Sequence, residues 1–233
     1  MHESDLRRVY VPLGTHADGT WTLLGGGVLV IDQPLAWLVT LKSLLERARD
    51  RSVASLVGSG EQGTLVDLSD IQAATGLGWI QHERLDLAAC LFPVQGEWGV
   101  KGFNESQCAA PDLLLPPAPT CALGAPPQTG AGRPTPIVVG GILSDVRADG
   151  MLLTTAPLLP LSQGAPLVLN TGLGTPPLLA GVLTQTVLLP DPDPRIPPLR
   201  LAEAVSVREI LGLVRSAAGK EQRTKALAAG KSA

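Results

Sequence analysis

Short apolar stretches dominate the sequence, and most of them are bounded by glycine, proline or aspartate. They run for about five to ten residues, which is the usual length of β-strands. The stretches lie at residues 21–31, 35–40, 53–58, 63–68, 85–92, 137–146, 151–156, 166–170 and 178–189. Many short strands separated by turn residues predict an all-β barrel or sandwich.

Two segments carry a helical pattern instead. Near the end, Ser206 and Glu209 have the spacing of a capping box, and apolar residues then recur at i, i+3, i+4 and i+7. Gly219 predicts the end of this helix. A shorter helix is expected at residues 41–49, directly after a strand.

The length of the chain permits two small barrels with a shared interface, since 233 residues with 45% hydrophobic content can bury a sizeable core. Proline and glycine are dense from residue 105 onwards, which is typical of a connector. We therefore expect an N-terminal β-barrel at residues 8–104, a connector at 105–116, and a C-terminal β-barrel plus closing helix at 117–218. The Ala- and Lys-rich end predicts a flexible tail at 219–233.

Charge and hydropathy exclude several classes of partner. A formal net charge of −3 with scattered basic residues argues against nucleic-acid binding. Residues 150–190 contain no charged side chain, yet their prolines and glycines interrupt any helix long enough to span a membrane. The charged first residues differ from a signal peptide, so a cytoplasmic location is expected.

Neither the cysteines nor the histidines form a metal-binding pattern. Three cysteines, at positions 90, 108 and 121, give no even count and no C-x-x-C pair. The histidines at positions 2, 16 and 82 are isolated. We therefore expect no disulfide framework, no metal site and no cofactor.

The order of several stretches resembles the trypsin-like serine proteases, in particular those of the high-temperature-requirement type. GGGVLVI followed by WLVTLKSLL is similar to the strand and segment that carry that family's catalytic histidine. LDLAACLF is similar to the strand that carries its aspartate, and VGGILSDVRADGMLLTTAPLLPLSQGAPLV to the segment that leads to its nucleophilic serine. LAGVLTQ and AVSVREILGLVRS follow in the family's order. These stretches lie at residues 25–31, 37–45, 85–92, 139–168, 179–185 and 204–216. The resemblance implies a two-barrel trypsin-like (chymotrypsin-type) fold with a C-terminal helix.

The same resemblance places the residues of the catalytic site. Ser43 stands at the position of the histidine, Asp86 at that of the aspartate and Gln163 at that of the nucleophilic serine. Leu161 stands where the family has the glycine of the oxyanion hole. A glutamine amide is no nucleophile and a serine hydroxyl is no base near neutral pH. Losing either group alone costs about a million-fold in a protease of this chemistry.

The sequence thus predicts a catalytically inactive homologue, a pseudoprotease that binds or scaffolds a protein or peptide partner. Pro157 would lie at the base of the primary specificity pocket. Leu183, Thr184 and Gln185 would form a wall along which a peptide adds as an edge strand.

Other interpretations stay open. One is a serine-type endopeptidase or other hydrolase with a non-standard site, for which a shifted triad of Ser162, His82 and Asp86 can be drawn. Another is a purely structural subunit, an oligomer included, with a partner interface hidden in the uncharged run at residues 150–190.

Overall fold

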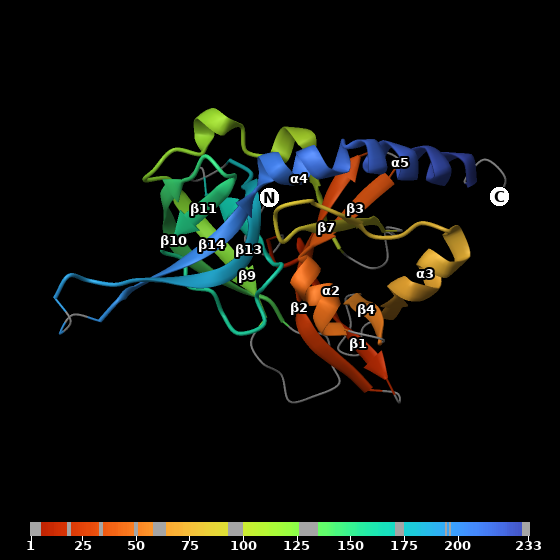
Figure 1. Cartoon of the computed structure of the whole chain (residues 1–233), viewed down its shortest axis with the longest axis horizontal. Helices are drawn as coiled ribbons and strands as arrows, with labels where there is room; N and C mark the ends of the chain where they lie inside the picture. The colour runs from red at the N-terminus through yellow and green to blue at the C-terminus, as the bar shows by residue number, and fades with distance from the viewer. Residues whose placement is uncertain are drawn as a thin grey trace.

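Two β units lie side by side in the computed structural model, and the C-terminal helices run along them (Figure 1). The structure describes residues 6–17, 20–32, 35–48, 51–57, 64–92, 100–125, 135–170, 175–193, 195 and 197–229. The N-terminal unit contains the first eight strands and the C-terminal unit the other six. Both units are built mainly of β-strands.

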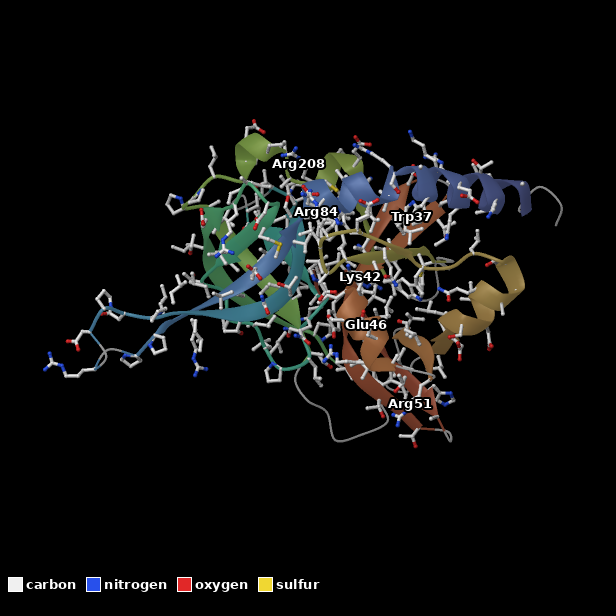
Figure 2. All side chains as sticks on the ribbon, viewed as in Figure 1. Trp37, Lys42, Glu46, Arg51, Arg84 and Arg208 are labelled. Atoms are coloured by element: carbon white, nitrogen blue, oxygen red, sulfur yellow. The ribbon has the colours of Figure 1, made fainter. Side chains whose placement is uncertain are left out.

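The N-terminal unit is an eight-stranded sheet. Its strands are β1 (Tyr10–Ala17), β2 (Thr20–Asp32), β3 (Leu35–Thr40), β4 (Ser52–Val57), β5 (Thr64–Asp67), β6 (Ile80–Gln81), β7 (Ala88–Leu91) and β8 (Phe103–Asn104). Their order is β5-β4-β1-β2-β3-β7-β6, and β8 pairs with β2 in parallel. Trp37 on β3 is fully buried in its core (Figure 2). Burying a side chain of that size contributes strongly to the stability of the unit.

The C-terminal unit is a closed six-stranded barrel. Its strands are β9 (Pro119–Gly124), β10 (Ile137–Val146), β11 (Met151–Thr154), β12 (Pro166–Leu169), β13 (Leu178–Leu189) and β14 (Leu199–Ser206), in the order β10-β11-β14-β13-β12-β9. Leu123, Leu143, Leu167 and Val182 from four of these strands are fully buried. The uncharged residues 150–190 supply three of the strands, so their lack of charge follows largely from burial.

The expectation of two closed barrels needs correction, because only the C-terminal unit closes. In the N-terminal unit, no strand pairing joins β5 to β6 among the described residues. Both edge strands are short, four and two residues long. A ladder of that length leaves few backbone groups available to close the sheet.

The nine apolar stretches left out β1, β6, β8, β9 and β14, of which β1 and β14 are the longest. β1 begins at Tyr10, directly after a charged segment, and its first six residues are buried. β14 begins at Leu199 after a run of prolines, aspartates and arginine. The residues that precede β1 and β14, rather than the composition of the strands themselves, hid these two strands from the sequence pattern.

Four helices pack on the sheets. They are α2 (Lys42–Ala48), α3 (Leu68–Thr75), α4 (Val207–Val214) and α5 (Ala217–Ala229). α2 confirms the short helix expected after the third strand. α3 was not predicted, although Asp67 accepts hydrogen bonds from Ser69 N and Asp70 N at its start and Gly76 ends it with a left-handed φ of 66°.

The helix expected at the capping-box sequence is confirmed as α4, but only half of the box forms. Ser206 Oγ accepts a 3.1 Å hydrogen bond from the backbone N–H of Arg208. The Glu209 carboxylate instead lies 3.5 Å from Nε2 of His82. The helix start therefore rests on the serine cap alone.

The end of the chain differs from the flexible tail that was expected at residues 219–233. Residues up to 229 belong to α5, and Gly219 lies inside that helix rather than ending the one before it. Ser216 Oγ accepts a 3.2 Å hydrogen bond from Gly219 N, and Arg223 pairs with Asp32 at 2.6 Å. Ala, Lys, Glu, Gln and Arg all favour helix, and docking on the N-terminal unit adds to that preference. Residues 230–233 lie outside the described part.

None of the described helices is both long enough and apolar enough to cross a membrane.

Candidate functional site

Ser43 and Asp86, which the sequence placed at the positions of a histidine and its aspartate, are in direct contact. Ser43 lies in the first turn of α2, and Asp86 lies in the turn before β7. The backbone N–H of Ser43 donates to Asp86 Oδ1 at 2.8 Å, and its hydroxyl donates to Asp86 Oδ2 at 2.5 Å. Both oxygens of the carboxylate are therefore bonded to one residue. The hydroxyl uses its only proton in this bond, and position 43 supplies no imidazole that could act as a base.

Gln163 lies in a turn of the C-terminal unit that packs against β2 of the N-terminal unit. Its carbonyl oxygen accepts a 2.8 Å hydrogen bond from Gly26 N. A side chain at Gly25 would collide with this carbonyl, since a Cβ there would lie 2.5 Å from Gln163 O and 2.4 Å from Leu44 Cδ1. Gly25 therefore sits between the turn that carries Gln163 and the helix that carries Ser43. Ser43 and Asp86 are thus in contact with each other, while the Gln163 turn is joined to α2 through Gly25 and Leu44.

Gly164 packs closely across this seam, and two hydroxyl groups fix the facing part of β2 within the N-terminal unit. Gly164 has a φ of 82°, and a Cβ on it would lie 2.1 Å from Gly26 O. The same Gly26 oxygen accepts a 2.7 Å hydrogen bond from Thr40 Oγ1. Tyr10 donates its hydroxyl to Gly25 O at 3.1 Å, and burial raises the pKa of this phenol far above its ordinary value. Tyr10 thus stays neutral and acts as a structural donor here.

Leu161 keeps a backbone conformation that usually belongs to glycine. Its φ is 59°, and it is the only residue other than glycine with a positive φ in the described part of the chain. The left-handed conformation costs a bulky residue roughly 1–2 kcal/mol. The turn is held by hydrogen bonds from Ser162 N to Leu159 O, Ala165 N to Ser162 O and Gly164 N to Leu183 O. Packing therefore imposes the turn in spite of the leucine side chain.

Two backbone N–H groups of this turn stay unused. Among the described residues, no hydrogen-bond acceptor meets the N–H of Leu161 or of Gln163. The resemblance assigns Leu161 to the glycine of the oxyanion hole and Gln163 to the nucleophilic serine. Free N–H groups next to a left-handed residue are suited to receive a carbonyl or carboxylate oxygen.

The shifted triad of Ser162, His82 and Asp86 does not assemble. Nδ1 of His82 accepts hydrogen bonds from Arg84 N and Leu85 N at 3.2 and 3.1 Å, and its Nε2 faces Glu209. The side chain of Ser162 is 1% exposed, and its hydroxyl has no partner among the described residues. A Cβ on Gly124 would lie 1.8 Å from this hydroxyl, so Ser162 points into the barrel wall and away from Asp86.

The residues expected to bind a peptide occupy different environments. Pro157 is exposed, whereas Leu183 is fully buried and both its N–H and its carbonyl bond to residues 164–165. Thr184 donates its hydroxyl to the Glu203 carbonyl at 3.1 Å, and Gln185 Nε2 donates to Glu203 Oε2 at 2.8 Å. Gln185 is therefore the one polar side chain of this set that lies on the surface.

Glu203 was missed by the sequence analysis, although it is the only charged residue within the buried part of β14. It is 7% exposed, and Arg147 donates to its Oε1 at 3.0 Å while Gln185 occupies Oε2. A buried carboxylate needs such partners, since an unpaired charge in a barrel wall costs several kcal/mol. The lone glutamate in the apolar stretch LRLAEAVS could have indicated this site.

The thiols of Cys90 and Cys108 are poorly suited to nucleophilic chemistry. Burial raises the pKa of the Cys90 thiol far above its ordinary value, and burial together with the nearby Glu105 carboxylate raises that of Cys108 to about 11. Both thiols are therefore protonated near neutral pH. Within the described ranges, no group of three or more His, Cys, Asp or Glu side chains is placed to hold a metal ion.

Comparison with known proteins shows the fold. No protein-family model matches the sequence, and no curated protein matches it. Among solved structures, the chain is similar to the crystal structure of the serine endoprotease from Yersinia pestis, with a TM-score of 0.57 and 18% identity over 91% of this chain. The chain spans 65% of that protein's length. The architecture thus fits the trypsin-like serine protease fold, with one barrel closed.

Proposed function

We propose that this chain is a trypsin-like serine protease homologue that does not cleave peptide bonds and instead binds an extended segment of a protein partner. The observation that carries the proposal is the double hydrogen bond of Ser43 to Asp86 at the place of a histidine–aspartate pair. Gln163 faces the same seam without a nucleophilic atom. The three positions that the resemblance assigns to the triad therefore hold neither an imidazole nor a nucleophilic side chain at position 163.

The size of the loss supports inactivity. Removing the base or the nucleophile alone costs about a million-fold in this chemistry, and here both are absent. The surviving N–H groups of Leu161 and Gln163 would polarise a bound carbonyl, but without a nucleophile they only bind it.

The partner segment would add to the open edge of β13. At Gly181 and Val182 this strand is paired on both sides, with β12 and with β14. From Gln185 to Leu189 its ladder continues with β14 alone, so the other edge has no strand partner among the described residues. An exposed edge with unpaired backbone groups accepts an extended peptide by main-chain hydrogen bonds. The open edge begins next to the turn at residues 161–164, so one peptide could contact both.

Two alternatives make different demands on the same surfaces. A hydrolase with a non-standard site needs a serine that a base activates. Among the described residues, the Ser43 hydroxyl bonds only to the Asp86 carboxylate, and the Ser162 hydroxyl has no partner. A structural subunit needs an apolar surface for its neighbour, and the exposed Leu188, Leu189 and Leu199 on the β13–β14 hairpin provide a small one. Native mass spectrometry would support the structural subunit if the chain formed a stable oligomer that bound no peptide.

The test is a display screen of linear peptides, followed by affinity measurements by fluorescence anisotropy. Residues of an added strand direct their N–H groups alternately toward and away from the sheet. We therefore expect that N-methylation at every second position of a bound peptide lowers its affinity and that methylation at the positions between does not. Uniform tolerance of N-methylation would contradict strand addition. Failure of every linear peptide to bind would contradict the proposed function itself.

A further inference from the structure

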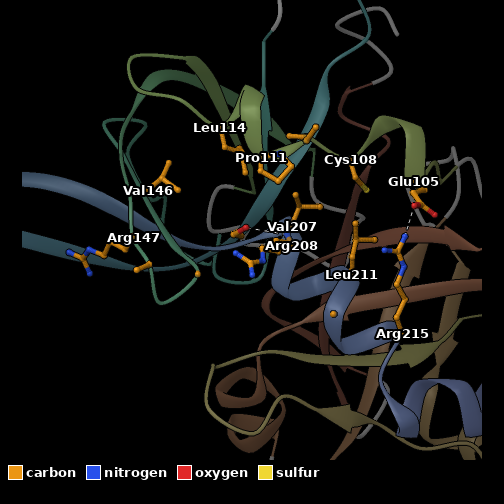
Figure 3. Close-up of a pocket in the computed structure, with 16 residues that line it drawn as sticks. Glu105, Cys108, Pro111, Leu114, Val146, Arg147, Val207, Arg208, Leu211 and Arg215 are labelled. Atoms are coloured by element: carbon orange, nitrogen blue, oxygen red, sulfur yellow. Dashed lines mark hydrogen bonds and ion pairs between the residues drawn. The ribbon is translucent and has the colours of Figure 1, made fainter.

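A cavity of about 570 Å³ lies on the side of the molecule where the connector meets α4 (Figure 3). The connector contributes two short 3-10 turns, η2 (Glu105–Gln107) and η3 (Pro111–Leu113), and the turn between β10 and β11 closes the third side. Ser43, Asp86, Leu161 and Gln163 do not line it. The volume falls in the range of small-molecule sites, about 300–1,000 Å³. The cavity is therefore separate from the positions that correspond to the protease site.

The walls of the cavity are largely apolar. Leu114 and Pro111 come from the connector, Val146 from the end of β10, and Val207 and Leu211 from α4. Such walls can take up the hydrocarbon part of a ligand, with about 25 cal/mol gained for each Å² of apolar surface removed from water.

A glycine in α4 keeps the cavity open. Gly212 lines it from the middle of the helix, where glycine is about 1 kcal/mol less favourable than alanine. A Cβ at this position would meet no atom within 4 Å, so no neighbour requires the glycine for close packing. A larger side chain at position 212 would extend into free space.

The polar part of the lining leaves one positive charge without a partner. Arg147 is bound by Glu203, and Arg215 pairs with Glu105 at 2.5 Å. The guanidinium of Arg208 has no ion pair or side-chain hydrogen bond within the described part of the chain. Arg208 lies in the first turn of α4, where the helix dipole also favours a negative charge. The charge that would complement this lining is a single anion.

We propose that this cavity binds a small amphiphilic monocarboxylate, with its carboxylate on Arg208 at the start of α4 and its apolar body against the connector and Leu211. A guanidinium can hold both oxygens of a carboxylate in parallel hydrogen bonds. This ligand site is independent of the proposed peptide binding, because it uses no residue of the cleft or of the β13 edge.

The test is isothermal titration calorimetry of the full chain with octanoate. Acetate has the same carboxylate without the long alkyl chain, and octylammonium has the alkyl chain with a positive charge in place of the carboxylate. We expect octanoate to bind measurably, acetate and octylammonium to bind at least about tenfold more weakly, and Arg208→Gln to weaken octanoate binding by at least about tenfold. Gly212→Leu should abolish it by filling the cavity.

Two control variants test whether losing any exposed arginine, or adding a leucine at any glycine, changes octanoate binding. Arg195→Gln removes an exposed arginine on the hairpin, and Gly78→Leu adds the same side chain at another glycine with no atom near its Cβ. Both should bind octanoate like the parent. The proposal is overturned by a parent that binds no octanoate, by equal binding of octylammonium, or by unchanged octanoate affinity in both Arg208→Gln and Gly212→Leu. Arg208 is exposed, so its replacement should leave the fold intact.

Discussion

Ser43 donates two hydrogen bonds to Asp86, one from its backbone N–H at 2.8 Å and one from its hydroxyl at 2.5 Å. The backbone bond needs no particular side chain, so the carboxylate keeps its place whichever residue occupies position 43. The hydroxyl takes the place of the ring N–H that would bond the carboxylate, and it supplies no second nitrogen to carry a proton to and from a nucleophile. The pair therefore stabilises the start of α2 and the turn before β7, and it has no means of activating Gln163.

The first prediction concerns Asp86 as a structural residue. Asp86→Asn should destabilise the fold by about 1–3 kcal/mol, because a neutral amide accepts weaker hydrogen bonds and can present only one oxygen to Ser43. Ser43→Ala should cost less, since the backbone bond remains. Urea denaturation measures both. Equal stability of Asp86→Asn and the parent would contradict a structural role for this carboxylate.

The second prediction concerns the strain at Leu161. Leu161→Gly should be less destabilising than Leu159→Gly by about 1–2 kcal/mol, because only position 161 has the left-handed φ that glycine adopts freely. Leu159 is a matched control, since both leucines are half-buried in the same turn. Equal losses in thermal or urea denaturation would show that the turn at 161 stores no strain.

The third prediction tests the cap of α4. Ser206→Ala should lower the free energy of unfolding by about 0.5–2 kcal/mol, since it removes the acceptor for Arg208 N. Ser144→Ala is the control, because that exposed hydroxyl makes only a 3.5 Å contact with Ile142 O. Equal stability of the Ser206→Ala and Ser144→Ala variants would contradict a stabilising N-cap at Ser206.

The fourth prediction follows from the raised pKa of Cys108. A shift from about 9 to about 11 leaves roughly a hundredfold less thiolate at pH 8, so alkylation of Cys108 by iodoacetamide should be about a hundredfold slower in the native protein than in urea. Mass spectrometry of the labelled peptide measures this ratio. The folded state favours the protonated thiol. The free energy that this preference adds to folding is therefore present below pH 9 and is lost as the pH rises toward 11. Native labelling as fast as in urea would contradict the burial of this thiol.

Much of the arrangement around the site was predictable from the sequence. The strand lengths gave the all-β class, and the order of the resembling stretches placed Ser43 beside Asp86 and Gln163 at the adjoining seam. The strand class depends on local pattern, which a sequence displays directly, whereas the site positions are what the resemblance to the protease family implies.

The rest depends on contacts between distant residues. Whether the N-terminal sheet closes is decided by the lengths of β5 and β6 and by their partners, which no local pattern reveals. The left-handed turn at Leu161 goes against the preference of leucine and exists because tertiary packing imposes it. α5 has a weak apolar face and is held by the pairing of Arg223 with Asp32, almost two hundred residues earlier in the chain. The cavity beside α4 likewise combines the connector with the last helices.

The central claim is tested most directly by labelling the purified chain with a fluorophosphonate probe, which reacts only with an activated serine. The double variant Ser43→His with Gln163→Ser is the control, because it restores a base next to Asp86 and a hydroxyl beside the free N–H groups of the turn. The account predicts no labelling of the parent and no cleavage of casein by it. Stoichiometric labelling of the parent that disappears in Ser43→Ala or in Ser162→Ala would contradict it.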